Sequence, residues 1–240
     1  MGSSGEIVVA HGIWRAISAI STIVPYEISV IGASGTGKTT LDRQLITRGE
    51  IRKYYEKDRT HHQKSWLGRY KLPMATKKRI QSDGLVKTIV SRDLGGHIEY
   101  HSTWLRDMIN RNCKTVVVVV DDRHVKDTNN VDNQTALGYL ITGLSDKKNT
   151  PKGLTWRGWW RAKKYFPKRV IILANKADEW MSDEDHKVWE KGFVARHPIF
   201  NVFREDFYKL QGMNIPVYID TISARYGWNV QDSLIKGLKV

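Results

Sequence analysis

The sequence predicts an α/β protein with a mostly parallel six-stranded sheet and helices on both faces. Strand-like and helix-like segments alternate along the 240 residues, a pattern typical of parallel sheets with crossover helices. Val116 to Val120 is an unbroken β-branched run, as expected for a central strand that is covered on both faces. The glycine-rich run Gly32 to Thr39 separates a short apolar segment from a helical one.

The predicted strands are short runs rich in β-branched and aromatic residues, bounded by turn residues. In chain order they are Tyr26 to Ile31, Lys78 to Gln81, Leu85 to Arg92, Thr115 to Asp121, Val170 to Ala174 and Val217 to Thr221. The second and third are predicted to pair across Ser82-Asp83-Gly84, an Asp-Gly hairpin signal. Leu41 to Ile46 continues a helix after the glycine-rich run. The motifs described below then fall on loops at the carboxyl ends of strands, where open α/β sheets bind ligands.

Gly32-Ala33-Ser34-Gly35-Thr36-Gly37-Lys38-Thr39 fits the pattern GxxxxGK[ST] and predicts a phosphate-binding loop. Its glycines allow a turn whose N–H groups point inward, Lys38 reaches the β and γ phosphates, and the Thr39 hydroxyl meets Mg²⁺. The predicted phosphate contacts are Ser34, Gly35, Thr36, Gly37, Lys38, Thr39 and Thr40, with Lys38 also assigned a catalytic role.

Asn175-Lys176-Ala177-Asp178 follows the apolar run Val170 to Ala174 and predicts a purine-recognition loop. A carboxylate at Asp178 can accept hydrogen bonds from N1–H and the exocyclic amino group of guanine, a donor pair that adenine lacks. Asn175, Lys176 and Asp178 are therefore predicted nucleotide contacts that select GTP over ATP.

Two further loops fit the same site. Asp93-Leu94-Gly95-Gly96-His97 supplies Asp93 to hold Mg²⁺ through water, Gly96 to direct an N–H at a γ-phosphate, and His97 to face the attacking water. Ser223, Ala224 and Arg225 follow the last predicted strand, and a backbone N–H of this loop is predicted to meet guanine O6.

From Tyr26 to the C-terminus, these residues resemble the Ras-like small GTPases, and within them the Sar/Arf family. Asp93 to His97 is similar to the Sar signature, which has His where most relatives carry Gln, and Trp104 falls where Sar/Arf proteins have a Trp on the next helix. Ser223 to Val230 is similar to the last loop and final helix of the family. The stretches between Ile51 and Lys77 and between Asp122 and Arg169 are longer than usual, which predicts insertions.

The resemblance implies a P-loop GTPase fold and slow hydrolysis of GTP by an in-line water, with His97 as the catalytic residue that orients it. It also implies GTP and GDP with Mg²⁺ as cofactors, and an exchange factor, an activating protein and effectors as partners. A conformational switch that depends on the γ-phosphate is the implied output.

The family also has a switch threonine that coordinates Mg²⁺ only when the γ-phosphate is present. Thr76 is the candidate chosen here, although it lies closer to the hairpin turn than the family pattern has it, and Thr60 is its rival. The predicted metal ligands are thus Thr39, Thr76 and Asp93.

Residues 1–25 are predicted to form an amphipathic segment, and residues 26–240 one GTPase domain with basic insertions near 51–75 and 145–169. Ile13, Ile17, Ile20 and Val24 recur at helical spacing, which fits either a lipid interface or a helix packed on the domain. The chain has a single cysteine and no apolar run long enough to span a membrane, so we expect a cytoplasmic protein. Of the two alternatives for this segment, the lipid interface would add peripheral membrane contact.

The formal net charge of +14 comes largely from two segments, one between Arg48 and Arg79 and one between Lys147 and Arg169. The second interleaves its basic residues with Trp156, Trp159, Trp160, Tyr165 and Phe166. This mixture suits an anionic membrane, an acidic protein partner, nucleic acid, or a solvated helix whose aromatic residues pack inward. Membrane or protein is favoured over nucleic acid.

Two rival functions stay open at this point. One is a GTP-binding scaffold that hydrolyses little, and the other is a P-loop NTPase that moves on nucleic acid along its basic segments.

Overall fold

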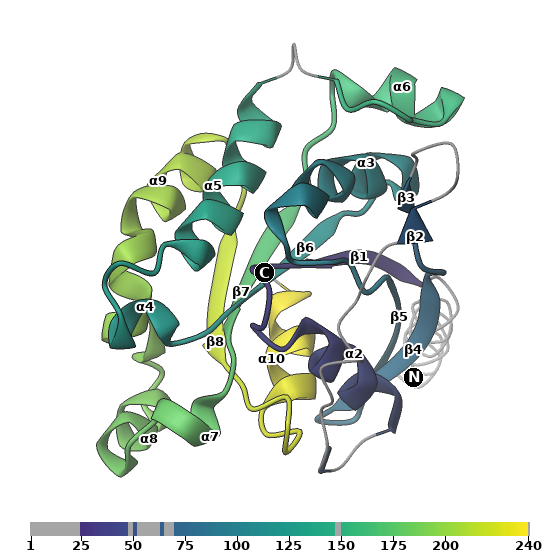
Figure 1. Cartoon of the computed structure of the whole chain (residues 1–240). Coiled ribbons are helices and arrows are strands. Elements are labelled where there is room, and N and C mark those ends of the chain that lie inside the picture. The colour runs from purple at the N-terminus through teal and green to yellow at the C-terminus, as the bar shows by residue number, and fades with distance from the viewer. Residues whose placement is uncertain (1–24, 48–49, 52–62, 65–69, 147–149, 240) are drawn as a thin grey trace, which may run out of the picture.

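The computed structural model describes residues 25–47, 50–51, 63–64, 70–146 and 150–239 (Figure 1). The predicted amphipathic segment therefore lies outside the described residues except for Pro25, as do most of the basic segment near 51–75 and Thr60.

A six-stranded sheet forms the centre of the molecule, in the spatial order β4-β5-β1-β6-β7-β8 (Figure 1). All neighbouring strands are parallel except β4 and β5, which confirms the predicted mostly parallel sheet. The strands are β1 (Tyr26–Ile31), β4 (Thr76–Ser82), β5 (Leu85–Ser91), β6 (Thr115–Val120), β7 (Arg169–Ala174) and β8 (Val217–Thr221). Two short strands, β2 (Gln63–Lys64) and β3 (Tyr70–Lys71), pair separately. Each predicted strand of the main sheet is found within two residues of its expected bounds.

Helices cover both faces of this sheet, as predicted. β6 is buried along its whole length: Val116, Val118 and Val120 belong to one apolar core, and Val117 and Val119 to the other. The first core includes side chains from α3 (His101–Arg111), α5 (Asp132–Ser145), α6 (Trp156–Ala162) and α9 (Arg204–Gly212), and the second includes α2 (Lys38–Thr47) and α10 (Val230–Gly237). The short helices are α4 (Arg123–Lys126), α7 (Ala177–Trp180) and α8 (Asp183–Glu190), with 3₁₀ turns at Ile98–Tyr100, Val194–Arg196 and Pro198–Phe203.

The predicted Asp-Gly hairpin joins β4 to β5. Asp83 and Gly84 have φ values of 47° and 72°, which are the positive angles that a type I′ turn requires at both central positions. The turn fixes the register in which Thr76 pairs with Ser91 and Ser82 with Leu85.

β1 lies between β5 and β6, so the chain changes direction across the sheet at this strand. The loops that leave β1, β5, β6, β7 and β8 all emerge at the carboxyl end of parallel strands, where such sheets bind ligands. The four motifs singled out in the sequence lie on these loops.

Lys78, one of the basic residues assigned to the first charged segment, is not a surface charge. Its side chain is buried, and its ammonium contacts the Asp42 carboxylate on α2 and the Ser91 hydroxyl on β5. The Ser91 hydroxyl also donates to Asp42 over 3.0 Å. This buried ion pair attaches the edge strand β4 to α2, the helix that begins within the glycine-rich motif.

We expect Asp42→Asn to lower the free energy of unfolding by about 3 to 5 kcal/mol, because it leaves the buried Lys78 ammonium without its counter-charge. The double variant Asp42→Asn with Lys78→Met should regain most of this loss, since no charge is then buried. Urea denaturation of the three proteins measures both effects. A single variant that costs no more than about 1 kcal/mol, the value for an exposed pair, would contradict the assignment.

Candidate functional site

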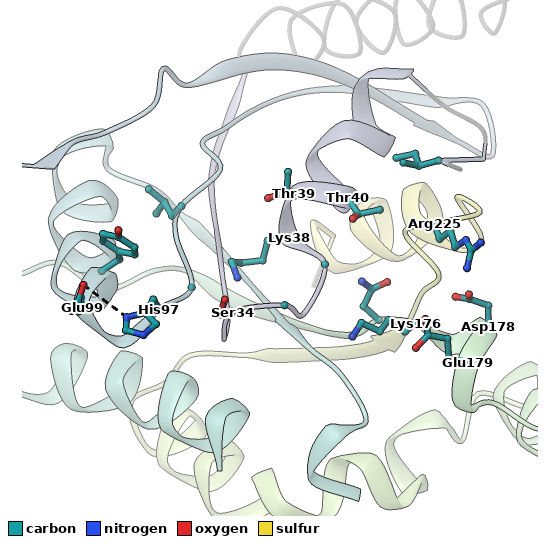
Figure 2. A pocket seen from close by; sticks show the side chains of 17 residues that line it. Ser34, Lys38, Thr39, Thr40, His97, Glu99, Lys176, Asp178, Glu179 and Arg225 are labelled. Carbon is teal, nitrogen blue, oxygen red and sulfur yellow. Dashed lines mark ion pairs between the residues drawn. The ribbon is translucent and has the colours of Figure 1, made fainter. Parts of the chain in front are cut away.

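A cavity of about 690 Å³ opens at the carboxyl edge of the sheet (Figure 2). Its volume lies in the range of small-molecule sites, about 300 to 1,000 Å³. Figure 2 shows His97 and Glu99 toward one end, Asp178 and Arg225 toward the other, and Lys38 between them. The lining residues are Ser34, Gly35, Gly37, Lys38, Thr39, Thr40, Ile51, Leu94, Gly96, His97, Glu99, Tyr100, Asn175, Lys176, Asp178, Glu179 and Arg225.

The glycine-rich loop forms the floor of this cavity between β1 and α2. Gly32 and Gly37 have φ values of 144° and 92°, which L side chains rarely adopt. A Cβ on Gly32 would lie 2.2 Å from the Val119 carbonyl oxygen, and one on Gly37 would lie 2.1 Å from Nδ2 of Asn175. Only glycine permits this close approach of the loop to β6 and to the loop after β7.

Lys38 occupies the centre of the floor, and its ammonium donates to the Ala33 carbonyl over 2.6 Å. The residue is only 6% exposed. Burial lowers the pKa of Lys38 to about 8, although the Asp93 carboxylate opposes this shift. Lys38 is therefore still a cation at neutral pH, but burial deprives its charge of hydration. An anionic ligand in the cavity would stabilise this charge.

Two of the three predicted metal ligands are adjacent. The Thr39 hydroxyl donates to Oδ2 of Asp93 over 2.8 Å, so two hard oxygen donors meet beside the glycine-rich loop. Carboxylate and hydroxyl oxygens next to a phosphate site are the donor set that Mg²⁺ uses in P-loop proteins, and these residues fit that ion. Thr76 opens β4 opposite Ser91, is exposed, and does not line the cavity.

The segment after Asp93 packs tightly against the glycine-rich loop. A Cβ on Gly96 would lie 2.4 Å from Nζ of Lys38 and 2.6 Å from the Ala33 carbonyl oxygen, so no side chain fits there. Trp104 on α3 donates from Nε1 to the Gly95 carbonyl over 2.9 Å and is fully buried, at the position where the resemblance places a tryptophan. The His97 side chain is 61% exposed, and its Nδ1 lies 4.0 Å from Oε2 of Glu99.

His101 supports the segment after Asp93, although the sequence did not indicate this role. It is buried against the Trp104 ring, and its Nε2 lies 3.4 Å from the Gly96 carbonyl oxygen. Burial lowers the pKa of His101, and the Gly96 carbonyl opposes this shift. A neutral imidazole that faces Gly96 adds no second cation beside Lys38.

The other end of the cavity is built from the loops after β7 and β8. Asp178 is exposed toward the cavity, and its Oδ1 accepts a 2.5 Å hydrogen bond from the Ser223 hydroxyl. Ser223 and Ala224 are buried and do not line the cavity, whereas Arg225 does. Ile51, whose N–H donates to the Arg225 carbonyl over 2.8 Å, adds an apolar wall that the sequence did not indicate.

Asn175 was predicted as a nucleotide contact, and it also joins two loops of the site. Its Nδ2 donates to the Thr36 carbonyl over 2.8 Å, and its Oδ1 accepts from the Ala224 N–H over 2.9 Å. The Thr36 hydroxyl turns away from the cavity and donates to the Ala33 carbonyl over 3.0 Å. One buried amide thus positions the glycine-rich loop relative to the purine end.

No protein-family model and no curated protein matches the sequence. Among solved structures, the chain is similar to the Arl6 BBS3 small GTPase from Trypanosoma brucei, whose structure holds the nucleotide analogue GppNp. The two share 12% sequence identity with a TM-score of 0.50, and the match covers 90% of this chain and 96% of that one. The chain has the small-GTPase fold. The fold class that the motifs predicted is confirmed.

Within this small-GTPase fold, Asp121 connects the glycine-rich loop to the purine end of the cavity, although the sequence indicated only a residue that ends a strand. Its carboxylate accepts from Nε and Nη2 of Arg123, each over 2.8 Å, and from the Lys176 ammonium over 2.9 Å. Burial acts to raise the pKa of Asp121, but the hydrogen bonds and charges of Arg123 and Lys176 outweigh it and lower the pKa to about 2. Arg123 in turn lies against the glycine-rich loop, since a Cβ on Gly35 would be 3.0 Å from its Nη2.

No helix in the described ranges is both long and apolar enough to pass through a membrane.

We expect Asn175→Ala to destabilise the protein by about 1 to 3 kcal/mol for each buried group that it leaves unpaired, the Thr36 carbonyl and the Ala224 N–H. Urea denaturation measures the loss, and amide hydrogen exchange should speed up at Ala224. Asn201→Ala is the matched control, because that asparagine is exposed and its side-chain oxygen accepts from a near neighbour in the chain, Arg204. Equal stability of the two variants would contradict the bridging role of Asn175.

Proposed function

We propose that the chain binds GTP and GDP with Mg²⁺ and hydrolyses GTP, acting as a Sar/Arf-like molecular switch. Its partners in this proposal are an exchange factor, an activating protein and effectors, and it works in the cytoplasm with peripheral contact to anionic membrane. The observation that carries the proposal is one continuous cavity with a buried lysine and glycine-rich loop in its middle and an accessible carboxylate, Asp178, at one end.

The Asp178 end supports a choice of guanine over adenine. The Ser223 hydroxyl occupies Oδ1 of Asp178, which orients the carboxylate and leaves acceptor capacity directed at the cavity. Guanine offers N1–H and an exocyclic amino group to such an acceptor, whereas adenine does not. A backbone N–H of the Ser223 to Arg225 loop is the predicted donor to guanine O6. The Ala224 N–H of this loop already donates to Asn175, so a purine oxygen there would share that donor or use the N–H of Arg225.

The centre of the cavity supports a role in holding phosphates. Backbone N–H groups of the glycine-rich loop and the start of α2 favour an anion, and the buried Lys38 adds a full charge. Thr39 and Asp93 would hold the magnesium ion, which neutralises charge on the β and γ phosphates when bound. Two candidates for the γ-phosphate-sensing threonine stay open: Thr76, at the same edge as Asp93, and Thr60, outside the described residues.

Hydrolysis rests on positioning and charge rather than on covalent chemistry. Gly96 lies against Lys38, and His97 follows it at the rim of the cavity, within reach of a water that attacks the terminal phosphate. One observation favours the scaffold alternative: the His97 side chain is 61% exposed, and solvent exposure leaves the orientation of its ring weakly constrained.

We expect Asp178→Ala to weaken GTP and GDP binding by about 5- to 150-fold, the equivalent of about 1 to 3 kcal/mol for an unpaired polar contact. ATP binding should change little. Affinities for the three nucleotides with Mg²⁺, measured by fluorescence or calorimetry, test this. Glu179→Ala is the matched control, because it removes a neighbouring carboxylate from the same cavity. A wild-type chain that binds ATP as tightly as GTP would refute guanine recognition.

We expect His97→Ala to slow single-turnover GTP hydrolysis by about a hundredfold, the usual contribution of a residue that directs a proton or water. GTP affinity should stay the same, so a rapid-quench or phosphate-release assay at saturating GTP isolates the chemical step. His186→Ala provides a histidine control outside the cavity, where the ring contacts Trp228. If both proteins and the wild type turn over no faster than GTP in buffer, the scaffold function is the correct one.

A further inference from the structure

The helix α6 presents three tryptophans to solvent. Trp156, Trp159 and Trp160 follow the i, i+3, i+4 spacing that places side chains on one helical face, and they are 76%, 56% and 63% exposed. Trp160 contacts Trp156 and Trp159 edge to face, with ring centroids 6.5 and 5.3 Å apart. The three rings therefore form one continuous apolar cluster on the outside of the molecule. Such a patch on a surface otherwise rich in charge marks a site of interaction.

The opposite face of α6 explains why these rings point outward. It is built from Gly158 and Ala162, which are buried, and a Cβ on Gly158 would lie 2.2 Å from Oδ1 of Asn110. Thr155 donates to Asn110 from its N–H and its hydroxyl, over 2.8 and 3.0 Å, and Arg161 donates to the carbonyls of Ile109 and Asn110. The helix is thus fixed to the end of α3 by small side chains and hydrogen bonds. Inward packing, one of the four alternatives that the sequence left open for this segment, holds for Tyr165, which is 4% exposed. It does not hold for the three tryptophans or for Phe166.

The chain segment that carries this cluster is basic. The sequence has no Asp or Glu between Asp146 and Asp178. Exposed cations flank the tryptophans on both sides in the chain, at Lys152, Arg157, Lys163, Lys164 and Lys168. Tryptophan is favoured at the boundary between lipid and water, where its ring is apolar and its N–H is wet, and lysine and arginine there meet lipid phosphate.

We propose that Trp156, Trp159 and Trp160, with Lys163 and Lys164, form a docking surface for an anionic lipid bilayer. This surface would provide the membrane contact of the proposed function, and the inference rests on that function in this respect. Docking itself requires neither GTP binding nor hydrolysis. Figure 1 shows α6 at the outer edge of the molecule beside α3, at the end opposite α2 and α7, where the cavity opens. Docking through α6 leaves that cavity open to nucleotide and regulators.

The arrangement of the rings favours lipid over nucleic acid. Single-stranded nucleic acid is bound by aromatic faces that are free to stack on successive bases along a basic groove. Here the interplanar angles of 80° and 85° turn the rings against one another, and the helix that bears them lies at the outer edge of the molecule (Figure 1). A compact apolar cluster on such an edge fits the flat headgroup region of a bilayer.

The test is vesicle co-flotation of the full chain in excess GDP, with phosphatidylcholine vesicles and with vesicles that also contain phosphatidylserine. We expect binding to the anionic vesicles and a loss of at least about tenfold in the partition coefficient for the triple variant Trp156→Ser, Trp159→Ser, Trp160→Ser. Lys163→Glu with Lys164→Glu should give a comparable loss. The matched controls are Lys187→Glu with Lys191→Glu, an identical charge change on exposed residues of the α8 region, and Tyr208→Ser, at an aromatic residue that is 73% exposed.

Three results would overturn the proposal: equal binding to neutral and anionic vesicles, a triple variant that partitions like the wild type, or binding to a single-stranded oligonucleotide in place of vesicles. Thermal melts and GDP affinity of each variant verify that the fold and the cavity are intact. The outcome is separable from that of the nucleotide experiments. If the chain binds vesicles through α6 but does not prefer guanine nucleotides, the proposed function is refuted and the docking surface is supported.

Discussion

The side-chain amide of Asn175 is the contact on which the geometry of the cavity depends. Its two hydrogen bonds join the glycine-rich loop after β1 to the loop after β8, two segments that are far apart in the sequence. Gly37 has no side chain because that amide occupies the space where a Cβ would lie. Trp180 adds a third contact by donating to the Asn175 carbonyl over 2.8 Å. Because an amide both donates and accepts, no carboxylate or hydrocarbon of similar size could hold both loops at once.

A second network fixes the same loops through charge. Asp121 binds Lys176 on one side and Arg123 on the other, and Arg123 also contacts Asp132 at the start of α5. Asp121 is buried, so its charge is stable only because both cations are held close to it. The ammonium of Lys176, the lysine of the Asn-Lys-Ala-Asp motif, is therefore paired with a structural carboxylate although the residue lines the cavity. Together the amide and the carboxylate explain how a loop with three glycines at positive φ keeps one shape.

The parts of this molecule that the sequence predicted are those whose signals are local. Val116 to Val120 can only be a strand covered on both faces, Asp83-Gly84 suits a type I′ turn, and a glycine-rich loop needs its glycines wherever it occurs. The parts it did not predict depend on partners distant in the chain. In the sequence Lys78 looks like a surface residue, because its partner Asp42 lies far away in the chain. Asp121 looks like the end of a strand, because the sequence does not show that Arg123 and Lys176 both contact its carboxylate. His101 gave no signal at all, because its role is set by the carbonyl of Gly96 and the ring of Trp104.

The direction of the α6 tryptophans illustrates the same limit and shows how α3 supports two distant sites. Tryptophans at helical spacing can pack in a core or face a membrane, so the composition of the segment left both positions open. The small residues Gly158 and Ala162 decide between them, because their face of α6 is the one that packs on the domain and the tryptophans face outward. The helix that receives them is α3, which also carries His101 and Trp104 against the segment beside Lys38 at its other end. A helix of 11 residues is about 16 Å long. The segment beside the cavity and the tryptophan helix therefore pack at opposite ends of α3. Partly buried ion pairs of α3, from Asp107 to Arg92 and Arg111 and from Arg111 to Glu27 on β1, join this helix to the sheet between them.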